Sequence, residues 1–171
     1  MIKIIADTTS TISPAEAGGL GIYYLPQLII FGDTSYRDDY EINSQEFLKR
    51  LRASSTLPKT AAPPPALYTP IYEEIRQGNH SGIVVCPSAK VSGTYDRALA
   101  ATKDFPDLDI RVVDTGVIGP ALGTLVKKAH QWVSEGDCAD TIIDRLTTLG
   151  KKVKIYFYVD TLEYLHKGGR I

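Results

Sequence analysis

Short apolar segments with the length of strands alternate with segments of helical spacing along the chain, and this alternation constrains the fold more than any single motif. Strand-like runs occupy residues 2–6, 22–31, 83–86, 110–113 and 153–159. The second run is interrupted or bent at Pro26. Strands that alternate with helices favour parallel sheets covered on both faces. The sequence therefore predicts the α/β class, with a mostly parallel sheet and helices on both of its faces.

Capping signals mark two of the intervening helices. Ser13-Pro14-Ala15-Glu16 is a capping box with proline at the first helical position, and Asn43 precedes a second helix. The sequence LPKTAAPPP at residues 57–65 holds four prolines and is expected to be an extended connection. Pro70 lacks a donor N–H, so it is placed in the first turn of the next helix. The residues expected to face the core are Phe47, Leu48 and Leu51, then Leu67, Ile71 and Ile75, then Val91, Tyr95, Ala98 and Leu99, then Leu122, Leu125, Val126, Ala129 and Val133, and finally Ile142, Ile143 and Leu146.

The composition argues against several classes of protein. The chain of 171 residues is long enough for one domain with a sizeable core, or for one lobe of a larger protein. Its formal net charge of −1 gives no long-range attraction to nucleic acid or to an anionic membrane. No apolar run is long enough to span a bilayer, and the apolar start is too short for a signal peptide. Cys86 and Cys138 form no metal or redox pattern, which fits a reducing, cytoplasmic location.

Three of the predicted strands end in the same dipeptide, at Asp7-Thr8, Asp114-Thr115 and Asp160-Thr161. The strand that ends at Cys86 leads instead into a loop rich in hydroxyls. Ligands of open parallel sheets bind beyond the carboxyl ends of the strands, so these ends are expected to form a polar rim on one side of the sheet. Each dipeptide can also be a helix cap or a turn. The rim residues predicted in this way are Asp7, Thr8, Thr9, Ser88, Asp114 and Thr115, with Asp7 expected to orient neighbouring hydroxyls.

Ser92-Gly93-Thr94 lies at the start of a predicted helix, where unpaired N–H groups and the helix dipole attract an anion. Glycine lets a ligand approach the backbone, and hydroxyls add neutral donors for a head group with two oxygens. Lys90 is the only cation of this loop, so a singly charged carboxylate fits better than a triphosphate. The glycine-rich phosphate-binding motif is absent. Simple helix capping explains the three residues equally well.

Nucleophilic catalysis by such a serine requires a base within hydrogen-bond reach. Of the three histidines, His80 precedes a strand and His130 lies within a long helix, whereas His166 is in the terminal segment and could approach the rim. No Gly-x-Ser-x-Gly motif is present. The sequence therefore gives no support for catalysis by this chain alone.

Six segments of the chain resemble the first lobe of the DegV family, bacterial fatty-acid-binding proteins that include the acyl-carrying subunit of fatty acid kinase. The segments are IADTTST from Ile5, IIFGDTSYRDDYEIN from Ile29, LPKTAAPPP from Leu57, SAKVSGTYDRALAA from Ser88, VDTG from Val113 and YVDTLEYLHKGGRI from Tyr158. They keep the family's order and approximate spacing across essentially the whole chain.

The resemblance implies a function and a set of ligand contacts. DegV proteins bind one long-chain fatty acid, with the tail in an apolar tunnel and the carboxylate in a hydroxyl-lined pocket. Carried over to this sequence, the ligand-binding residues are Thr60, Ala61, Ser92, Gly93, Thr94 and Arg170. The resemblance thus implies a non-catalytic carrier of a fatty acid such as palmitate, without metal or cofactor, that presents the carboxylate to a separate kinase subunit for formation of an acyl phosphate.

The sequence also departs from the family pattern. Ala61 and Ala62 stand where the family has serine and glutamine, Pro64 replaces a small residue, and Thr11 stands where an aspartate is usual. Losing one hydrogen bond to a charged group costs on the order of 1.5–3 kcal/mol, or roughly ten- to a hundredfold in affinity.

The family's second lobe is absent after Ile171. Residues 1–160 are therefore expected to be the α/β fatty-acid-binding lobe, and residues 161–171 the start of a connection to the absent lobe, in either a fragment or a shortened relative. An isolated lobe would expose half of a tunnel, which predicts a homodimer or lipid-dependent solubility. Two other functions stay open: a metal-assisted phosphotransferase or hydrolase built on Asp7, Asp114 and Asp160, and a degenerate interaction module that has lost its ligand.

Overall fold

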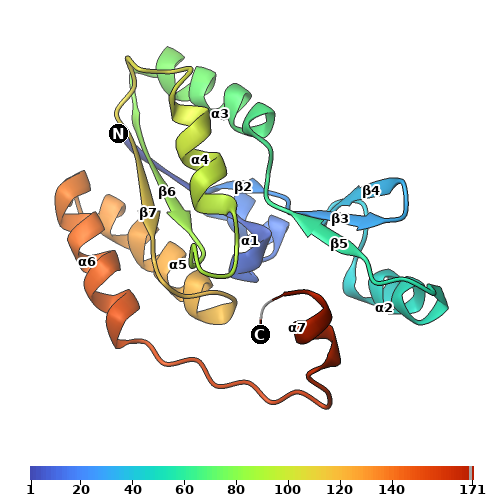
Figure 1. Cartoon of the computed structure of the whole chain (residues 1–171). Coiled ribbons are helices and arrows are strands. Elements are labelled where there is room, and N and C mark those ends of the chain that lie inside the picture. Colours follow the sequence, from blue (N-terminus) through green and yellow to red (C-terminus); the bar gives the residue numbers. More distant parts are fainter. Residues whose placement is uncertain (170) are drawn as a thin grey trace.

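The computed structural model of the chain describes residues 1–169 and 171, and Figure 1 shows how its elements are arranged. In chain order the elements are β1 (Ile2–Asp7), the 3-10 helix η1 (Thr8–Ser10), α1 (Pro14–Gly19), β2 (Tyr23–Leu25), β3 (Leu28–Phe31), β4 (Thr34–Arg37), α2 (Ser44–Ala53), β5 (Lys59–Ala61), α3 (Pro65–Gln77), β6 (Ser81–Cys86), α4 (Thr94–Thr102), β7 (Ile110–Asp114), α5 (Pro120–Ser134), α6 (Ala139–Lys152) and α7 (Glu163–Lys167). Within this described part, no helix is long and apolar enough to cross a membrane.

The main sheet consists of four parallel strands in the order β2-β1-β6-β7. Successive side chains of a strand point to opposite faces. Ile4 and Ala6 of β1 accordingly lie in a buried cluster with residues of α1, α5 and α6, whereas Ile5 lies in a second cluster with residues of α3 and α4. Helices therefore cover both faces of the sheet (Figure 1). The prediction of an α/β fold with a mostly parallel sheet is confirmed.

Helix α5 lies very close to the segment that follows β1. A Cβ atom at Gly123 would be only 2.4 Å from the backbone oxygen of Ser10. The backbone N–H of Gly119, just before α5, donates to the backbone oxygen of Thr9 at 2.8 Å. The glycine at position 123 lets α5 approach this backbone closely, whereas any larger residue there would collide with it. The close approach helps to hold Thr9 in place.

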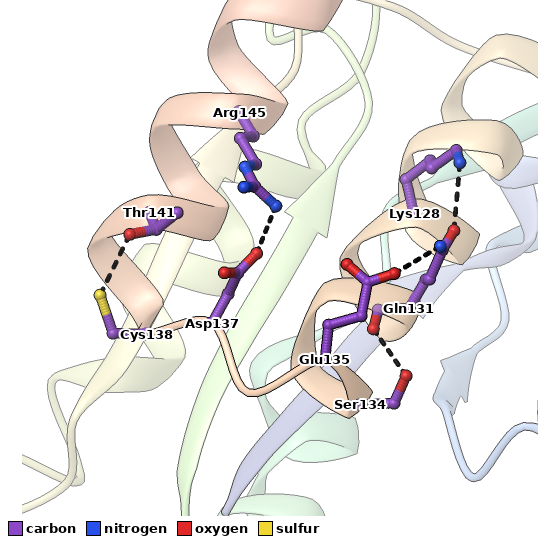
Figure 2. A network of polar contacts seen from close by, with 8 residues as sticks. All are labelled: Lys128, Gln131, Ser134, Glu135, Asp137, Cys138, Thr141 and Arg145. Atoms are coloured by element: carbon purple, nitrogen blue, oxygen red, sulfur yellow. Dashed lines mark hydrogen bonds and ion pairs between the residues drawn. The ribbon is translucent and has the colours of Figure 1, made fainter.

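Polar contacts lie on the surface around the turn between α5 and α6 (Figure 2). Gln131 accepts from Lys128 Nζ at 3.1 Å and donates to Glu135 Oε1 at 2.6 Å. Arg145, in the middle of α6, pairs with Asp137 in the turn before that helix. Exposed pairs of this kind contribute little to stability, so the turn depends mainly on the buried faces of its two helices.

A second, antiparallel sheet of three strands, in the order β4-β3-β5, projects from the main sheet and carries α2 (Figure 1). The sequence did not predict it. The run at residues 22–31 does break at Pro26, as predicted, but its two halves enter different sheets as β2 and β3. The proline-rich connection contains β5, where three residues without proline pair with β3.

Residues 153–159 form no strand in the structure, so that prediction was wrong. Helix α6 continues to Lys152, and the segment that follows is extended and open to solvent. Tyr156 and Tyr158 are 90% and 93% exposed. The alternation of side chains is strand-like, but no strand of the described chain pairs with it. Asp160-Thr161 therefore lies away from the sheet, and the Thr161 hydroxyl accepts from the N–H of Glu163 in front of α7.

Several expected core positions are shifted. Helix α2 buries no residue fully because it covers only the small sheet, and Leu48 is 46% exposed. Because α3 begins at Pro65, Pro70 lies in its second turn and not in its first. In α3 and α4 the buried stripe is displaced along the helix. The fully buried residues there are Tyr68, Tyr72 and Ile75 in α3 and Thr94, Ala98 and Ala101 in α4, whereas Val91 and Leu99 are exposed.

Candidate functional site

A cleft of about 630 Å³ lies between the carboxyl end of the main sheet and the small sheet. Its polar lining comes from the segments after β1 and β4, the residue before β3, the start of α2, strand β5 and the loop before α4. The polar residues are Thr9, Gln27, Asp38, Asn43, Ser44, Thr60 and Ser92. Its apolar lining includes Ile29, Phe47, Val91, Ile118, Phe157 and Leu165. The cleft thus joins one hydroxyl-rich end to apolar walls.

A second groove of about 760 Å³ continues from this cleft. The two share Phe47, Thr60 and Leu165. The second groove runs between α2, the segment before β5 and α7, and its apolar residues include Leu51 and Leu57. Lys59 and Lys167 also line the second groove, so its lining is mixed.

Asp7 lies behind the polar end of the cleft, only 2% exposed. Its Oδ1 accepts from the N–H of Thr9 at 2.9 Å and from the hydroxyl of the same residue. Its Oδ2 accepts from Gln27 Nε2 at 2.7 Å and from the Thr94 hydroxyl at 2.8 Å. Burial raises the pKa of Asp7, while the hydrogen bonds from Thr9, Thr94 and Gln27 act in the opposite direction.

Ser92 lies at the mouth of this network, immediately before α4. Its hydroxyl is 3.0 Å from the Thr94 hydroxyl and accepts from the Thr94 N–H at 3.3 Å. Gly93 is the N-cap residue and provides no side chain to cap the helix. Ser92 and Gly93 line the cleft, whereas Thr94 is 2% exposed and lies behind them.

Gln27 is a functional candidate that the sequence analysis missed. Its Nε2 donates both to Asp7 and, at 2.9 Å, to the Thr94 hydroxyl. Its backbone N–H donates to the Thr8 hydroxyl at 3.0 Å. The available signal was a single amide side chain directly after Pro26, between two apolar runs. Asp38 was also missed, and burial raises its pKa beside the cleft.

The remaining rim candidates hold loops and do not line the cleft. The backbone oxygen of Ser88 accepts from the N–H groups of Val91 and Ser92, each at 3.1 Å. Asp114 accepts from the N–H of Ala89 at 3.2 Å, and the Thr115 hydroxyl donates to the Cys86 oxygen at 2.8 Å. Together with Thr8, which supports Gln27, these side chains position the loop that carries Ser92.

The residues carried over from the family resemblance are placed unequally. Thr60 and Ala62 line the cleft, whereas Ala61 between them on the extended chain does not, as expected from the alternation of a strand. Arg170 lies outside the described residues.

The lining of the cleft is divided between a polar end and apolar walls. The described lining contains neither histidine nor cysteine, and the described chain holds no group of three His, Cys, Asp or Glu residues that could hold a metal ion. Neutral hydroxyl and amide donors dominate the polar end, while the rest is apolar. Such a lining suits an amphipathic ligand with a small polar head.

The chain is similar to known proteins over its full length. The profile of the DegV family, described as uncharacterised proteins, matches residues 1–171. A DegV domain-containing protein from Halalkalibacterium halodurans is 32% identical over 171 residues, which are 99% of this chain and 60% of that protein. The chain thus spans about 60% of the length of the curated relatives that it matches.

Two solved structures share the fold closely. One is described as showing fatty acid binding of a DegV family protein from Thermus thermophilus; it has 29% identity and a TM-score of 0.88, and the match covers 99% of this chain and 60% of that one. The other is a stearic acid-binding protein from Eubacterium ventriosum, with 25% identity and a TM-score of 0.89 at the same coverage.

Proposed function

Because the chain belongs to the DegV family, we propose that it binds a long-chain fatty acid and presents the carboxylate, without catalysing a reaction itself. The observation that carries the proposal is the lining of the cleft itself, where the polar end at Ser92 and Gln27 adjoins apolar walls that include Ile29, Phe47 and Ile118. A fatty acid has the same division between a two-oxygen head and a long apolar tail. The fatty acids bound by the related proteins support this assignment.

In this proposal the carboxylate lies beside Ser92 and Gly93 at the start of α4. A helix start attracts an anion, and the Ser92 hydroxyl adds a neutral donor. Thr60 faces the same space from β5. The resemblance adds Arg170 as a further contact. The acyl chain would run past Phe47 and Leu165, which line both the cleft and the second groove.

The wider setting belongs to the same proposal. The family resemblance supports a cytoplasmic carrier whose bound carboxylate is phosphorylated by a separate kinase subunit. It also supports the division into a lobe at residues 1–160 and a connection at residues 161–171. If the chain is only a carrier, the purified chain with palmitate and ATP will release no ADP, and release will require an added kinase.

No specific observation favours the alternative function of a metal-assisted phosphotransferase or hydrolase. Two of its carboxylates lie at strand ends, but Asp160 lies away from the sheet. The interaction module likewise has no observation that favours it over a fatty-acid carrier.

The deciding experiment is native mass spectrometry of the purified chain, followed by denaturation and lipid identification. We expect a bound fatty acid such as palmitate or stearate at up to one per chain. Ser92→Ala should lower its occupancy, whereas Ser134→Ala, at an exposed position of α5, should not. The proposal fails if solvent extraction never yields a fatty acid and added palmitate gives no thermal shift.

A further inference from the structure

The hydrogen bonds behind the cleft have a direction that follows from the chemistry of their members. An ionised carboxylate only accepts, whereas a hydroxyl has one proton to donate and two lone pairs. Asp7 in its ionised form accepts four times, twice from Thr9 and once each from Gln27 and Thr94. The hydroxyl protons of Thr9 and Thr94 are therefore both used on Asp7.

Gln27 fixes the other side of Thr94. The two protons of its Nε2 go to Asp7 and to the Thr94 oxygen. With its own proton on Asp7, the Thr94 hydroxyl can only accept at its contact with Ser92, at 3.0 Å. The chain of hydrogen bonds consequently runs from Ser92 to Thr94 to Asp7. Both lone pairs of the Thr94 oxygen are then occupied.

Ser92 differs from Thr9 and Thr94, the other two residues whose hydroxyls belong to this series of hydrogen bonds. It lines the cleft, and its proton goes only to Thr94. Turning that proton toward a ligand breaks its bond to the Thr94 oxygen, which keeps its bonds to Asp7 and Gln27. The Thr94 N–H still donates to the Ser92 hydroxyl at 3.3 Å, so Thr94 continues to hold Ser92 in place. Thr94 itself is buried behind Ser92 and has no proton to offer.

We propose that Thr94 is a positioning residue and not a ligand contact: with Asp7 and Gln27 it orients Ser92. Among the hydroxyls of Thr9, Ser92 and Thr94, only that of Ser92 donates to the ligand's carboxylate. This deepens, and rests on, the proposed fatty-acid site. It also differs from the direct contact that the family resemblance implies for Thr94. Gln27 acquires a role in the site although its own contacts are with Asp7 and Thr94.

A double-mutant cycle on the palmitate affinity of the full chain tests the assignment. Ser92→Ala should lower the affinity by roughly ten- to a hundredfold, because a hydrogen bond to a charged group is lost. Thr94→Val should lower it by about three- to tenfold in the parent chain, but add nothing to Ser92→Ala, because it acts through Ser92. Equal losses from Thr94→Val in both backgrounds would overturn the proposal.

Two variants separate positioning from a general effect of substitution in α4. Thr94→Ser keeps the hydroxyl and should restore nearly the parent affinity. Thr102→Val removes a hydroxyl at the other end of the same helix, where it donates to the Leu99 oxygen, and should leave the affinity unchanged. A loss in Thr94→Ser as large as in Thr94→Val would contradict a role for the hydroxyl chain.

A second cycle needs no fatty acid. Urea unfolding of the four ligand-free proteins should show a coupling between Ser92→Ala and Thr94→Val, since the two hydroxyls bond to each other. Strictly additive effects on the free energy of unfolding would refute the series of hydrogen bonds, even if palmitate binds. Coupling without any palmitate binding would instead support the series of hydrogen bonds and refute the proposed function.

Discussion

Asp7 is a carboxylate placed where a second carboxylate is proposed to bind. Among the described residues, no cation forms an ion pair with Asp7. The negative charge of Asp7 contributes to raising the pKa of Tyr24, Asp38, Tyr68 and Cys86. Hydrogen bonds from neutral donors therefore hold this charge, and the network depends on every one of them.

The stability of the chain should depend on pH through Asp7. Burial raises its pKa from the ordinary value of 3.8, so the folded chain holds the proton more tightly than the unfolded chain. The stability that this contributes is fully present below pH 3.8 and is lost as the pH rises through the folded-state pKa. Urea unfolding between pH 4 and pH 8 should show this loss, and Asp7→Asn should flatten the slope. An unchanged slope in the variant would contradict the assignment.

Gln27 should be costly to replace. Gln27→Leu removes a donor from both Asp7 and Thr94 and leaves buried acceptors short of a partner, so the free energy of unfolding should fall by about 1–3 kcal/mol. Gln131→Leu is the matched control, because its partners in Figure 2 are exposed. Its effect should stay within about 0.5 kcal/mol. Similar losses in both variants would show that burial of the Asp7 network is unimportant.

At the scale of single residues, the sequence predicted the polar side chains that lie at strand ends and helix starts. Asp7 was expected to orient hydroxyls, and the structure places Thr9 and Thr94 on it. Gln27 and Asp38 could not be found in this way, because they come from the connections of a second sheet that brings them to the cleft only through tertiary packing.

The packing of α5 against η1 makes a specific prediction at the scale of elements. Gly123→Ala places a methyl group against the backbone of Ser10, and such overpacking typically costs about 1–3 kcal/mol. It should also displace Thr9 and weaken palmitate binding. Gly18→Ala in α1 meets no atom within 4 Å and should be neutral or stabilising by up to about 1 kcal/mol. Thermal unfolding compares them, and a neutral Gly123→Ala would mean that α5 can shift freely.

Helices and strands were predictable where their length and the spacing of their apolar residues were clear, as for the four parallel strands and the long helices. The small sheet was not, because β4 has only four mostly polar residues and β5 has three inside a proline-rich stretch. Residues 153–159 show the opposite error. Alternation gives a segment the potential to be a strand, but a strand requires a partner for its backbone groups.

At the scale of the whole molecule, the exposed aromatic residues of that segment predict self-association. Unpaired extended backbone and exposed apolar side chains favour contact with another chain. Sedimentation velocity should show a concentration-dependent dimer that weakens when Tyr156 and Tyr158 are both changed to serine. Leu99→Gln on α4 alters an isolated exposed residue and should leave the dimer intact. A parent chain that stays monomeric at high concentration would contradict this prediction.

Only two connections join the small sheet to the rest of the chain, Pro26-Gln27 on entry and Ala62 to Pro64 on exit. Proline fixes φ and restricts the residue before it, so both connections resist bending. The two sheets are therefore expected to move as one rigid frame, with the gap between them nearly constant whether the cleft is empty or filled. A ligand would then enter and leave by sliding along its own length. The width of the ligand would affect binding more than its flexibility.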